Sequence, residues 1–271
     1  MVQDARKLLK GITKKISPFE KPEASHEIKK SVTKSNGLTR SRYRMTLVEK
    51  RVMEMLISKV DPTKPNPANA SNRAVHMTFD EYGDETNPHP YWFSITAKEY
   101  ASFTNTHEKT AYKEIVKAGK RLEKITIYVT ESAKQIAKPL LYKSVYDEGS
   151  GYLKVLFHPE LIPHILELKE KFTKYPLESA IKFKSTYSWR LYEVLLSIKN
   201  THNKSITYSI DDLVEVLGMP ESYTKYWVSI SRVIEKSMQE ITILTNLDVS
   251  YTKNKQNKKI TSITIHIEDK K

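Results

Sequence analysis

Two segments of the chain, one early and one late, carry apolar residues at helical spacing. Apolar positions in residues 45–60 predict a helix that ends before Pro62, because proline cannot continue a helix. In residues 183–199, FKSTYSWRLYEVLLSIK, the apolar positions form a broad stripe on one face. This second helix also contains Arg190, and Glu193 follows within reach of an ion pair. We therefore expect both segments to be core helices.

A series of shorter elements follows the first helix. Thr96 and Glu99 have the spacing of a capping box, in which each side chain accepts a bond from the backbone N–H of the other residue. The polar pair Thr104-Asn105 is expected to be a turn. The expected elements are a strand at residues 91–95, a short helix at 97–103, a longer helix at 106–124, and strands at 125–129, 139–146 and 151–157.

The same order recurs after the second helix. Ser209 provides a second cap, with Asp212 in the place of the glutamate, and residues 218–220, Gly-Met-Pro, are expected to be the turn. Ile-Thr-Ile follows the longer helix in both copies, at residues 125–127 and 241–243. The expected elements are a strand at residues 205–208, a short helix at 210–217, a longer helix at 223–239, a strand beginning at 241–243, and a strand at 260–267.

Helix, strand, helix, turn, helix and hairpin is the element order of a winged helix-turn-helix domain. Two copies in one chain predict an α+β fold with two tandem winged helix-turn-helix domains, and a length of 271 residues suits two domains. We expect residues 41–170 to form the N-terminal domain and residues 171–271 the C-terminal one. Residues 1–40 show no core periodicity and are interpreted as a basic arm, while residues 62–72 are interpreted as an exposed Pro/Asn-rich loop.

The net charge changes what such domains are expected to bind. The formal charge is +13 and the isoelectric point is about 9.5, a balance that favours a polyanion such as nucleic acid. Residues 1–50 contain 13 Lys and Arg against 5 Asp and Glu, so they hold +8 of the total. A composition biased toward lysine on every surface is the alternative, and for residues 1–40 a solvated leader is equally compatible.

The sequence lacks the residue patterns of enzymes that cut DNA or hydrolyse nucleotides. None of the 8 histidines forms a His-x-His pair, so the metal site of relaxases and rolling-circle initiators is missing. Residues 118–121, Ala-Gly-Lys-Arg, lack the first glycine and the following Ser or Thr of a phosphate-binding loop. The acidic residues of 80–85 are interpreted as a solvated loop rather than a cation site. We expect no enzyme activity, no catalytic residue, no cofactor and no metal.

Cysteine usage and hydropathy indicate a compartment. The chain has no cysteine, which fits a reducing cytoplasm and excludes disulfides and thiolate metal sites. No apolar run approaches 18 residues, and residues 1–15 lack the hydrophobic core of a signal peptide. We therefore expect a soluble cytoplasmic protein that does not associate with a membrane.

The longer helix of the second copy is the expected base-reading helix, because the second helix of such a motif lies in the major groove. Arg232 is the side chain we expect to contact guanine, since its planar fork matches O6 and N7. A surface arginine paired with Glu235 is the alternative. The residues of this helix expected to contact DNA are Lys225, Ser229, Arg232 and Lys236. Of these, Lys225 and Ser229 are expected to contact phosphates.

Two further basic segments are expected to touch the DNA backbone. The hairpin tip at residues 251–259 contains four lysines and no acidic residue, so a wing that displaces counterions is favoured over a solubilising turn. The longer helix of the first copy exposes lysines around its outer face, which suits phosphates better than bases. These lysines are Lys253, Lys255, Lys258 and Lys259 in the wing, and Lys109, Lys113, Lys117 and Lys120 in the first helix.

Several short motifs occur in the order found in one family of DNA-binding proteins. Tyr187–Glu193, YSWRLYE, closely resembles the Y-S-x-R-L-Y-E stretch of replication initiators from iteron-bearing plasmids. The resemblance extends from about residue 35 to residue 267 through further segments in the same order: Asn36–Thr39, Leu47–Arg51, Arg232 with Gln239–Ile241, and the basic tip. Two positions depart from the family: the tip has no glycine, and Ser231 stands where a second arginine is common. These departures affect base preference rather than the class of protein.

The resemblance implies a function for each domain. Members of this theta-type initiator family have two winged-helix domains, bind direct repeats at the origin as monomers and often repress their own promoter as dimers. In the family the C-terminal domain reads bases, and the N-terminal domain contacts the backbone and forms the dimer. The implied partners are double-stranded origin DNA, a second copy of the chain, and the host helicase and initiator. A dimeric winged-helix transcriptional regulator is the alternative function.

The sequence itself gives one indication of self-association. The strands expected at residues 125–129 and 140–146 carry apolar and aromatic residues on both faces, and a small domain buries one face of such a hairpin. A second copy is one way to cover the other face. Coverage by the N-terminal helices and by residues 91–93 is the alternative.

Overall fold

The computed structural model describes residues 28, 31–63, 92–131, 134–147, 151–199, 201 and 204–270. Residues 1–27 of the expected arm, most of the expected loop at 62–72 and the acidic residues of 80–85 lie outside these ranges. The elements that belong to neither repeat copy are β1 (Ser31–Ser35), α2 (Asn36–Thr39), β3 (Thr126–Glu131), β4 (Lys134–Pro139), η3 (Pro159–His164), β7 (Phe172–Pro176) and α8 (Leu177–Ala180).

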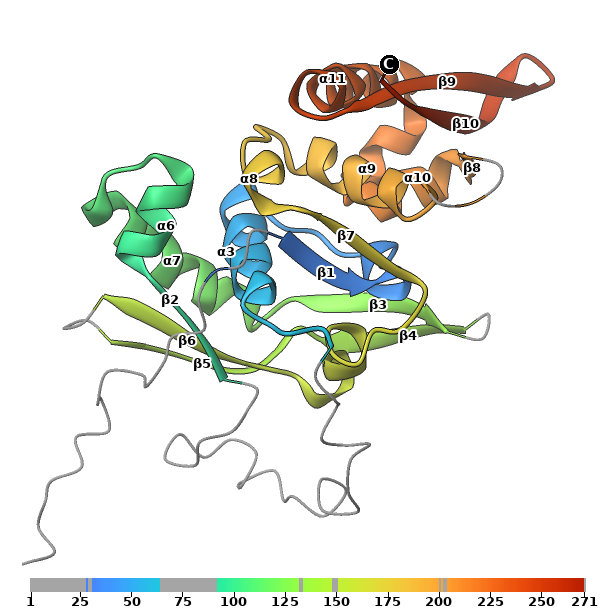
Figure 1. The fold of residues 1–271 in the computed structure, drawn as a ribbon. Helices are drawn as coiled ribbons and strands as arrows, with labels where there is room; N and C mark the ends of the chain where they lie inside the picture. Colours follow the sequence, from blue (N-terminus) through green and yellow to red (C-terminus); the bar gives the residue numbers. More distant parts are fainter. Residues whose placement is uncertain are drawn as a thin grey trace, which may run out of the picture.

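The N-terminal domain has the expected winged-helix order. Its three helices lie on one face of a three-stranded antiparallel sheet with strand order β2-β6-β5 (Figure 1). Gly119 of α7 lies so close to this sheet that an added Cβ would meet Leu153 at 2.6 Å, which shows how tightly helix and sheet pack. The elements are α3 (Leu47–Ser58), β2 (Trp92–Thr96), α6 (Ala97–Thr104), α7 (Glu108–Leu122), β5 (Leu141–Asp147) and β6 (Tyr152–Phe157).

The C-terminal domain repeats this arrangement. Its sheet has strand order β8-β10-β9, which corresponds strand for strand to β2-β6-β5. The prediction of two tandem copies is therefore confirmed. The elements are α9 (Thr186–Leu196), β8 (Ser205–Ser209), α10 (Ile210–Leu217), η4 (Glu221–Lys225), α11 (Trp227–Leu244), β9 (Leu247–Gln256) and β10 (Lys259–Asp269).

Local chemistry starts and stops the helices where the sequence indicated. Thr96 and Glu99 form the predicted capping box, and Asn105 ends α6 in the left-handed region at φ 53°. The Ser209 side chain accepts a bond from the Asp212 N–H at the start of α10. Gly218 ends that helix with φ 71°, a conformation that glycine adopts without the steric cost of a Cβ.

Two predicted elements were wrong. Residues 241–243 are not a strand, because α11 continues to Leu244: Ile230, Ile234 and Ile241 keep one buried stripe at helical spacing. The strand at residues 125–129 does not pair with the one at 140–146. Instead β3 pairs with β4, an unpredicted hairpin inserted before the sheet of the N-terminal domain. The two Ile-Thr-Ile runs therefore do not mark equivalent elements.

The expected arm is also shorter than residues 1–40. Ser31–Ser35 forms β1 and pairs antiparallel with β7 near the middle of the chain. Val32 and Leu38 are fully buried, so residues 31–40 belong to the folded core. Lys34 in β1 is fully buried as well. The alternation of polar and apolar residues is too short there to predict a strand whose partner lies about 140 residues away.

Figure 1 shows the C-terminal domain above the N-terminal one, with α9 and the β1–β7 pair between them. Helix α9 packs against α11 and α10 above and against β7 below. One continuous set of buried apolar side chains runs through both domains. The domain boundary between residues 170 and 171 stays a prediction.

Candidate nucleic-acid interface

The outer face of α11 carries three of the four polar residues expected of a reading helix: Arg232 and Lys236 are exposed, and Ser229 is half-buried. Lys225 is exposed but lies in η4, because α11 begins at Trp227 and not at residue 223 as expected. Arg232 makes no hydrogen bond or ion pair with any residue that the structure describes, and Glu235 instead accepts a bond from the Tyr251 hydroxyl at 3.0 Å. The alternative pairing of Arg232 with Glu235 is thus not formed, and the guanidinium is available to a partner outside the chain.

The wing is a longer hairpin than the sequence indicated. Strand β9 runs to Gln256, so Lys253 and Lys255 lie in a strand, and the turn consists of Asn257 and Lys258 with φ values of 49° and 68°. Asparagine tolerates this left-handed region, which explains a tip without glycine. The four wing lysines, Lys253, Lys255, Lys258 and Lys259, are all exposed.

The base of the wing is attached to the start of α11. The Lys253 ammonium lies over the Trp227 ring, 5.5 Å from its centroid, and the Trp227 and Tyr251 rings pack at 6.2 Å. A cation over an aromatic face is stabilised by the ring quadrupole. These contacts fix the hairpin relative to the helix that is expected to read bases.

Helix α7 presents the lysines predicted for phosphate contact. Lys109, Lys113, Lys117 and Lys120 are all exposed, as expected. Lys120 lies over the Tyr146 ring at 4.8 Å, and Arg121 pairs with Glu49 at 3.2 Å. The structure places these side chains but does not test whether they touch DNA.

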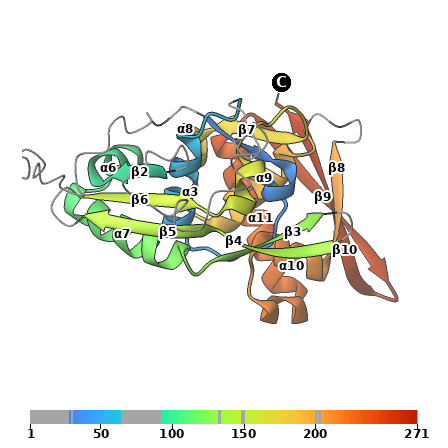
Figure 2. The same cartoon turned by 90° about the horizontal axis from the view of Figure 1, so that it is seen from below.

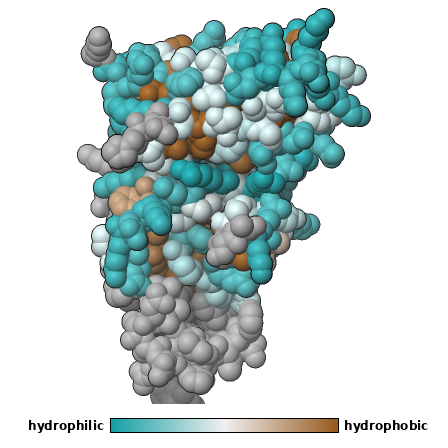
Figure 3. All heavy atoms as spheres, turned by 90° about the vertical axis from the view of Figure 1, so that its right-hand side faces the viewer, coloured by the Kyte–Doolittle hydropathy of each residue, from teal (hydrophilic) through white to brown (hydrophobic). Residues whose placement is uncertain are grey.

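The basic elements of the two domains lie on one side of the molecule. In Figure 2, α7 and the β9–β10 hairpin reach the lower part of the view on either side of α10, whereas β1 and β7 lie at the opposite edge. Figure 3 shows a neighbouring face on which hydrophilic residues predominate, with hydrophobic ones in small patches between them. One duplex running along the lower edge of Figure 2 could meet both domains.

A buried ionic cluster lies between these surfaces. Glu193 of α9 accepts bonds from the ammonium groups of Lys34 and Lys50 at 2.6 and 2.9 Å. Glu54 of α3 accepts from the same two lysines at 2.7 and 2.5 Å. Arg190 completes the cluster with a 3.1 Å bond to Glu193, which confirms the expected ion pair. Three cations and two carboxylates are therefore at most 1% exposed.

Mutual attraction keeps these groups ionised. Burial by itself would raise the pKa of Glu193, but the surrounding cations outweigh it and hold this pKa far below its usual range. Burial would lower the pKa of Lys50, but Glu193 and Glu54 outweigh it and raise this pKa. The Tyr175 hydroxyl donates to Glu193 at 2.6 Å, and burial followed by the charge of Glu193 raises its pKa.

Arg190 also holds the segment that enters the first helix. Its guanidinium donates to the backbone oxygens of Thr39 at 3.0 Å, Ser41 at 2.5 Å and Val216 at 3.0 Å. The motif Tyr187–Glu193 is thus a structural link between domains, and its arginine does not face DNA. Lys34, Lys50 and Glu54 were not predicted from the sequence; the available signal was the spacing of Lys50 and Glu54, which are four residues apart on the helix expected at 45–60.

Gly218 of the C-terminal domain packs against the same segment of the N-terminal domain. An added Cβ would lie 2.6 Å from the backbone oxygen of Tyr43. The nearest atom is backbone, so the clash cannot be relieved by rotating a side chain.

Replacing Gly218 with alanine is therefore expected to lower the free energy of unfolding by about 1–3 kcal/mol, since strain at a positive φ adds to the clash. Denaturant titration checks this. Gly37→Ala is the matched control, because its Cβ would meet nothing closer than 3.5 Å. Equal stability of the two variants would contradict the tight contact.

Comparison with known families agrees with this architecture. The family described as "Initiator Replication protein, WH1" matches residues 31–196, and "Initiator Rep protein, WH2" matches residues 209–267. The chain belongs to the initiator replication protein family. Its resemblance to initiators of iteron plasmids and its two tandem winged-helix domains are thereby confirmed.

Two relatives show how far the similarity of this family member extends. A replication initiation protein from Escherichia coli is 27% identical over 198 residues, which are 72% of this chain and 56% of that protein. The chain thus spans a little over half the length of that curated relative. A crystal structure of the Pi initiator protein in complex with iteron DNA matches with a TM-score of 0.67 and 21% identity, over 88% of this chain and 97% of that one. At that identity the likeness shows the fold alone.

Two kinds of feature are absent from the described part of this family member. No group of three or more His, Cys, Asp or Glu side chains in that part is arranged to hold a metal ion. No helix there is long and apolar enough to cross a membrane.

Proposed function

We propose that this protein initiates plasmid replication by binding direct repeats (iterons) in double-stranded origin DNA. The observation that carries the proposal is the exposed Arg232 on α11, which has no partner among the described residues and lies beside a lysine-rich wing that is on the same side of the molecule as α7. Family membership and a fold shared with an initiator crystallised on iteron DNA support it. The protein acts in the cytoplasm as a DNA-binding component, without a catalytic site of its own, and recruits the host helicase and initiator.

The proposal is tested on the DNA that flanks the gene. Tandem repeats of about two helical turns, roughly 20 base pairs, beside an AT-rich tract are expected there. Full-length protein should bind one repeat more tightly than a scrambled duplex of the same composition. Deleting the repeats should abolish replication of a plasmid that depends on this protein. Binding to an inverted promoter repeat alone, with no effect of the deletion, would contradict the proposal.

The lysines of α7 are expected to contribute affinity without sequence preference. Lys113→Ala and Lys117→Ala should each weaken cognate and scrambled duplexes by the same factor, because both lysines are exposed and suited to phosphates. Each change should also reduce the slope of log Kd against the logarithm of the salt concentration by about one. Fluorescence anisotropy over a salt series checks both. A loss confined to the cognate duplex would assign base reading to α7.

A second role, repression of its own promoter by a dimer, is favoured by one feature of the N-terminal domain. Strand β5 is the edge of its sheet and pairs only with β6 among the described strands. An open edge offers backbone groups to the same strand of a second copy. Tyr128 of the neighbouring β3–β4 hairpin is 44% exposed, so one aromatic residue of the strand expected at residues 125–129 is not covered by the described part of the chain.

The dimer is expected in sedimentation of the free protein, with conversion to monomers on direct-repeat DNA. Dimers should bind inverted sites more tightly than single sites. A protein that stays monomeric at every concentration, with equal affinity for single and inverted sites, would remove the dimer and the repressor role.

A further inference from the structure

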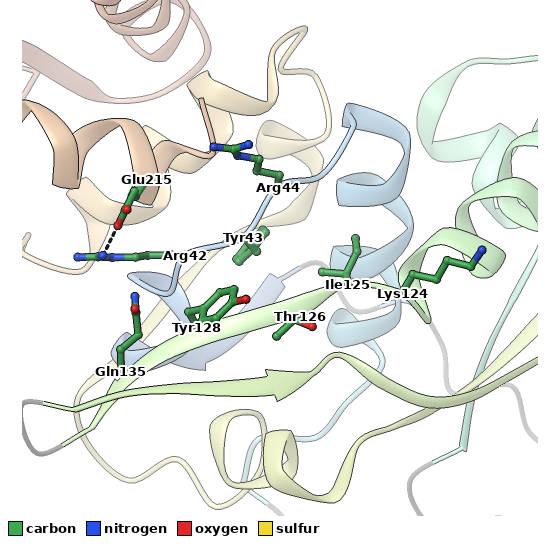
Figure 4. Close-up of a pocket in the computed structure, with 9 residues that line it drawn as sticks. All are labelled: Arg42, Tyr43, Arg44, Lys124, Ile125, Thr126, Tyr128, Gln135 and Glu215. Atoms are coloured by element: carbon green, nitrogen blue, oxygen red, sulfur yellow. Dashed lines mark hydrogen bonds and ion pairs between the residues drawn. The ribbon is translucent and has the colours of Figure 1, made fainter. Parts of the chain in front are cut away.

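The junction of the two domains contains a cleft that the contacts proposed above do not use. It has a volume of about 450 Å³ and lies between residues 42–44, the β3–β4 hairpin and α10 (Figure 4). A second hollow of about 300 Å³ is lined by residues of the same segment, by the start of α9 and by Gly218 at the end of α10. Tyr43 lines both hollows, so they adjoin each other at the junction, and the two together are called the depression below.

The charges along this depression are not balanced. Arg42 is turned toward α10, where it pairs with Glu215 and with Asp212 at 2.7 Å (Figure 4). Arg44 and Lys124 both line the first cleft and are exposed, and in Figure 4 their side chains extend outward from it in opposite directions. Neither forms an ion pair or hydrogen bond with the residues that the structure describes. The one carboxylate lining the first cleft, Glu215, is thus already compensated, and two cations remain.

The second hollow adds groups that favour an anion. It is lined by Thr46, which caps α3, and by Thr186 and Tyr187 in the first turn of α9. Helix N-termini carry partial positive charge, and the first turn of α9 has no acidic residue. Burial and the charge of Tyr223 raise the pKa of Tyr187, and the Arg44 guanidinium opposes this rise. Arg44, which lines the first cleft, therefore also acts electrostatically on a residue of the second hollow.

The position of the depression identifies the anion. At one end Lys124 follows the lysine face of α7, and at the other Tyr187 lies near Tyr223 of η4, which leads directly into α11. A polyanion that touches both helices must cross the junction between them. Duplex DNA carries a phosphate at regular intervals along this path, so a duplex that touches both helices also places phosphates at the junction.

We propose that this depression, with Arg44 and Lys124 as its cations, seats the phosphodiester backbone of duplex DNA between α7 and α11. The inference rests on the proposed function and adds a phosphate site to it. Because the site touches the sugar-phosphate backbone, it strengthens cognate and non-cognate binding alike.

The test compares Arg44→Ala, Lys124→Ala and the double variant with wild-type protein. The probes are the cognate repeat and a scrambled duplex over a salt series. The double variant should bind both duplexes more weakly by the same factor, at least about tenfold at low salt, and its salt slope should fall by about two. Lys174→Ala is the matched control: Lys174 is exposed on β7, at the opposite edge in Figure 2, and its loss should change neither quantity.

Phosphate substitution locates the contact. Methylphosphonates, which remove one phosphate charge, are introduced singly along the cognate duplex. At one or two adjacent positions between the segments protected by α7 and α11, the substitution should weaken wild-type binding and leave the double variant unaffected. An unchanged salt slope, a loss confined to the cognate duplex, or equal effects of every methylphosphonate on both proteins would overturn the proposal.

Two further comparisons distinguish a failure of the phosphate site from a failure of the proposed function. If inorganic phosphate binds the wild type and not Arg44→Ala while both bind DNA equally, the depression is a site for free anions and the proposal is overturned. If the cleft variants behave as wild type while Arg232→Ala loses cognate binding, the site fails and the proposed function stands. If the wild-type protein bound the repeat no more tightly than the scrambled duplex, the proposed function itself would be contradicted.

Discussion

Replacing Glu193 with glutamine is expected to lower the free energy of unfolding by about 3–5 kcal/mol, the cost of removing one partner from a buried charge group. Glu193 is fully buried and faces three cations, which only Glu54 would then balance. Glutamine keeps the size of the side chain, so the effect reports charge rather than a cavity. Urea unfolding followed by circular dichroism measures it.

Glu178→Gln is the matched control for that experiment. Glu178 is exposed in α8, a few residues before α9, so its replacement should change stability by less than about 0.5 kcal/mol. If Glu193→Gln were as stable as this control, the cluster would not contain the ionised groups that its geometry indicates.

The same cluster predicts how stability depends on pH. The pKa of Glu193 is lowered in the folded protein, so its contribution is fully present above the unfolded value, about 4.3, and is lost as pH falls toward the folded value. Wild-type protein should therefore lose stability steeply below about pH 4. Glu193→Gln should show a shallower dependence there, because the glutamine does not titrate.

Replacing Arg232 with alanine should weaken binding to the cognate repeat by about 1–3 kcal/mol, or roughly 5- to 150-fold. The exposed guanidinium has no partner among the described residues, so its removal costs no intramolecular bond and leaves the fold intact. Weak binding to scrambled DNA should persist, since the lysines of α7 and the wing remain. Competition anisotropy with both duplexes measures the ratio.

Lys174→Ala serves again as the control, since it removes an exposed charge far from α11. A base-specific contact should also relax discrimination at one position of the repeat, visible when each base pair is replaced in turn. Cognate affinity equal to that of the wild type would show that another residue of the chain reads the bases.

The sequence by itself determined the local elements and their repetition. Helical and strand periods depend on neighbours a few residues apart, and the caps at Thr96 and Ser209 act within a single turn, so all of these are visible in the chain. The lysine face of α7 and the outer stripe of α11 followed from the same periodicity. Both surfaces lie where helical spacing placed them, and their contact with DNA stays a prediction.

Only the tertiary structure decided which distant segments meet. Lys34 and Lys50 appear in the sequence as ordinary surface cations, yet Glu54 and Glu193 offset the cost of burying them. Strand β1 exists because β7, far along the chain, supplies its hydrogen bonds. Arg44 and Lys124 are 80 positions apart in the chain, and the packing of α3 against α7 brings them to one cleft. Such pairings depend on contacts between residues that no local pattern connects, which is why periodicity predicted the domains and not the junction between them.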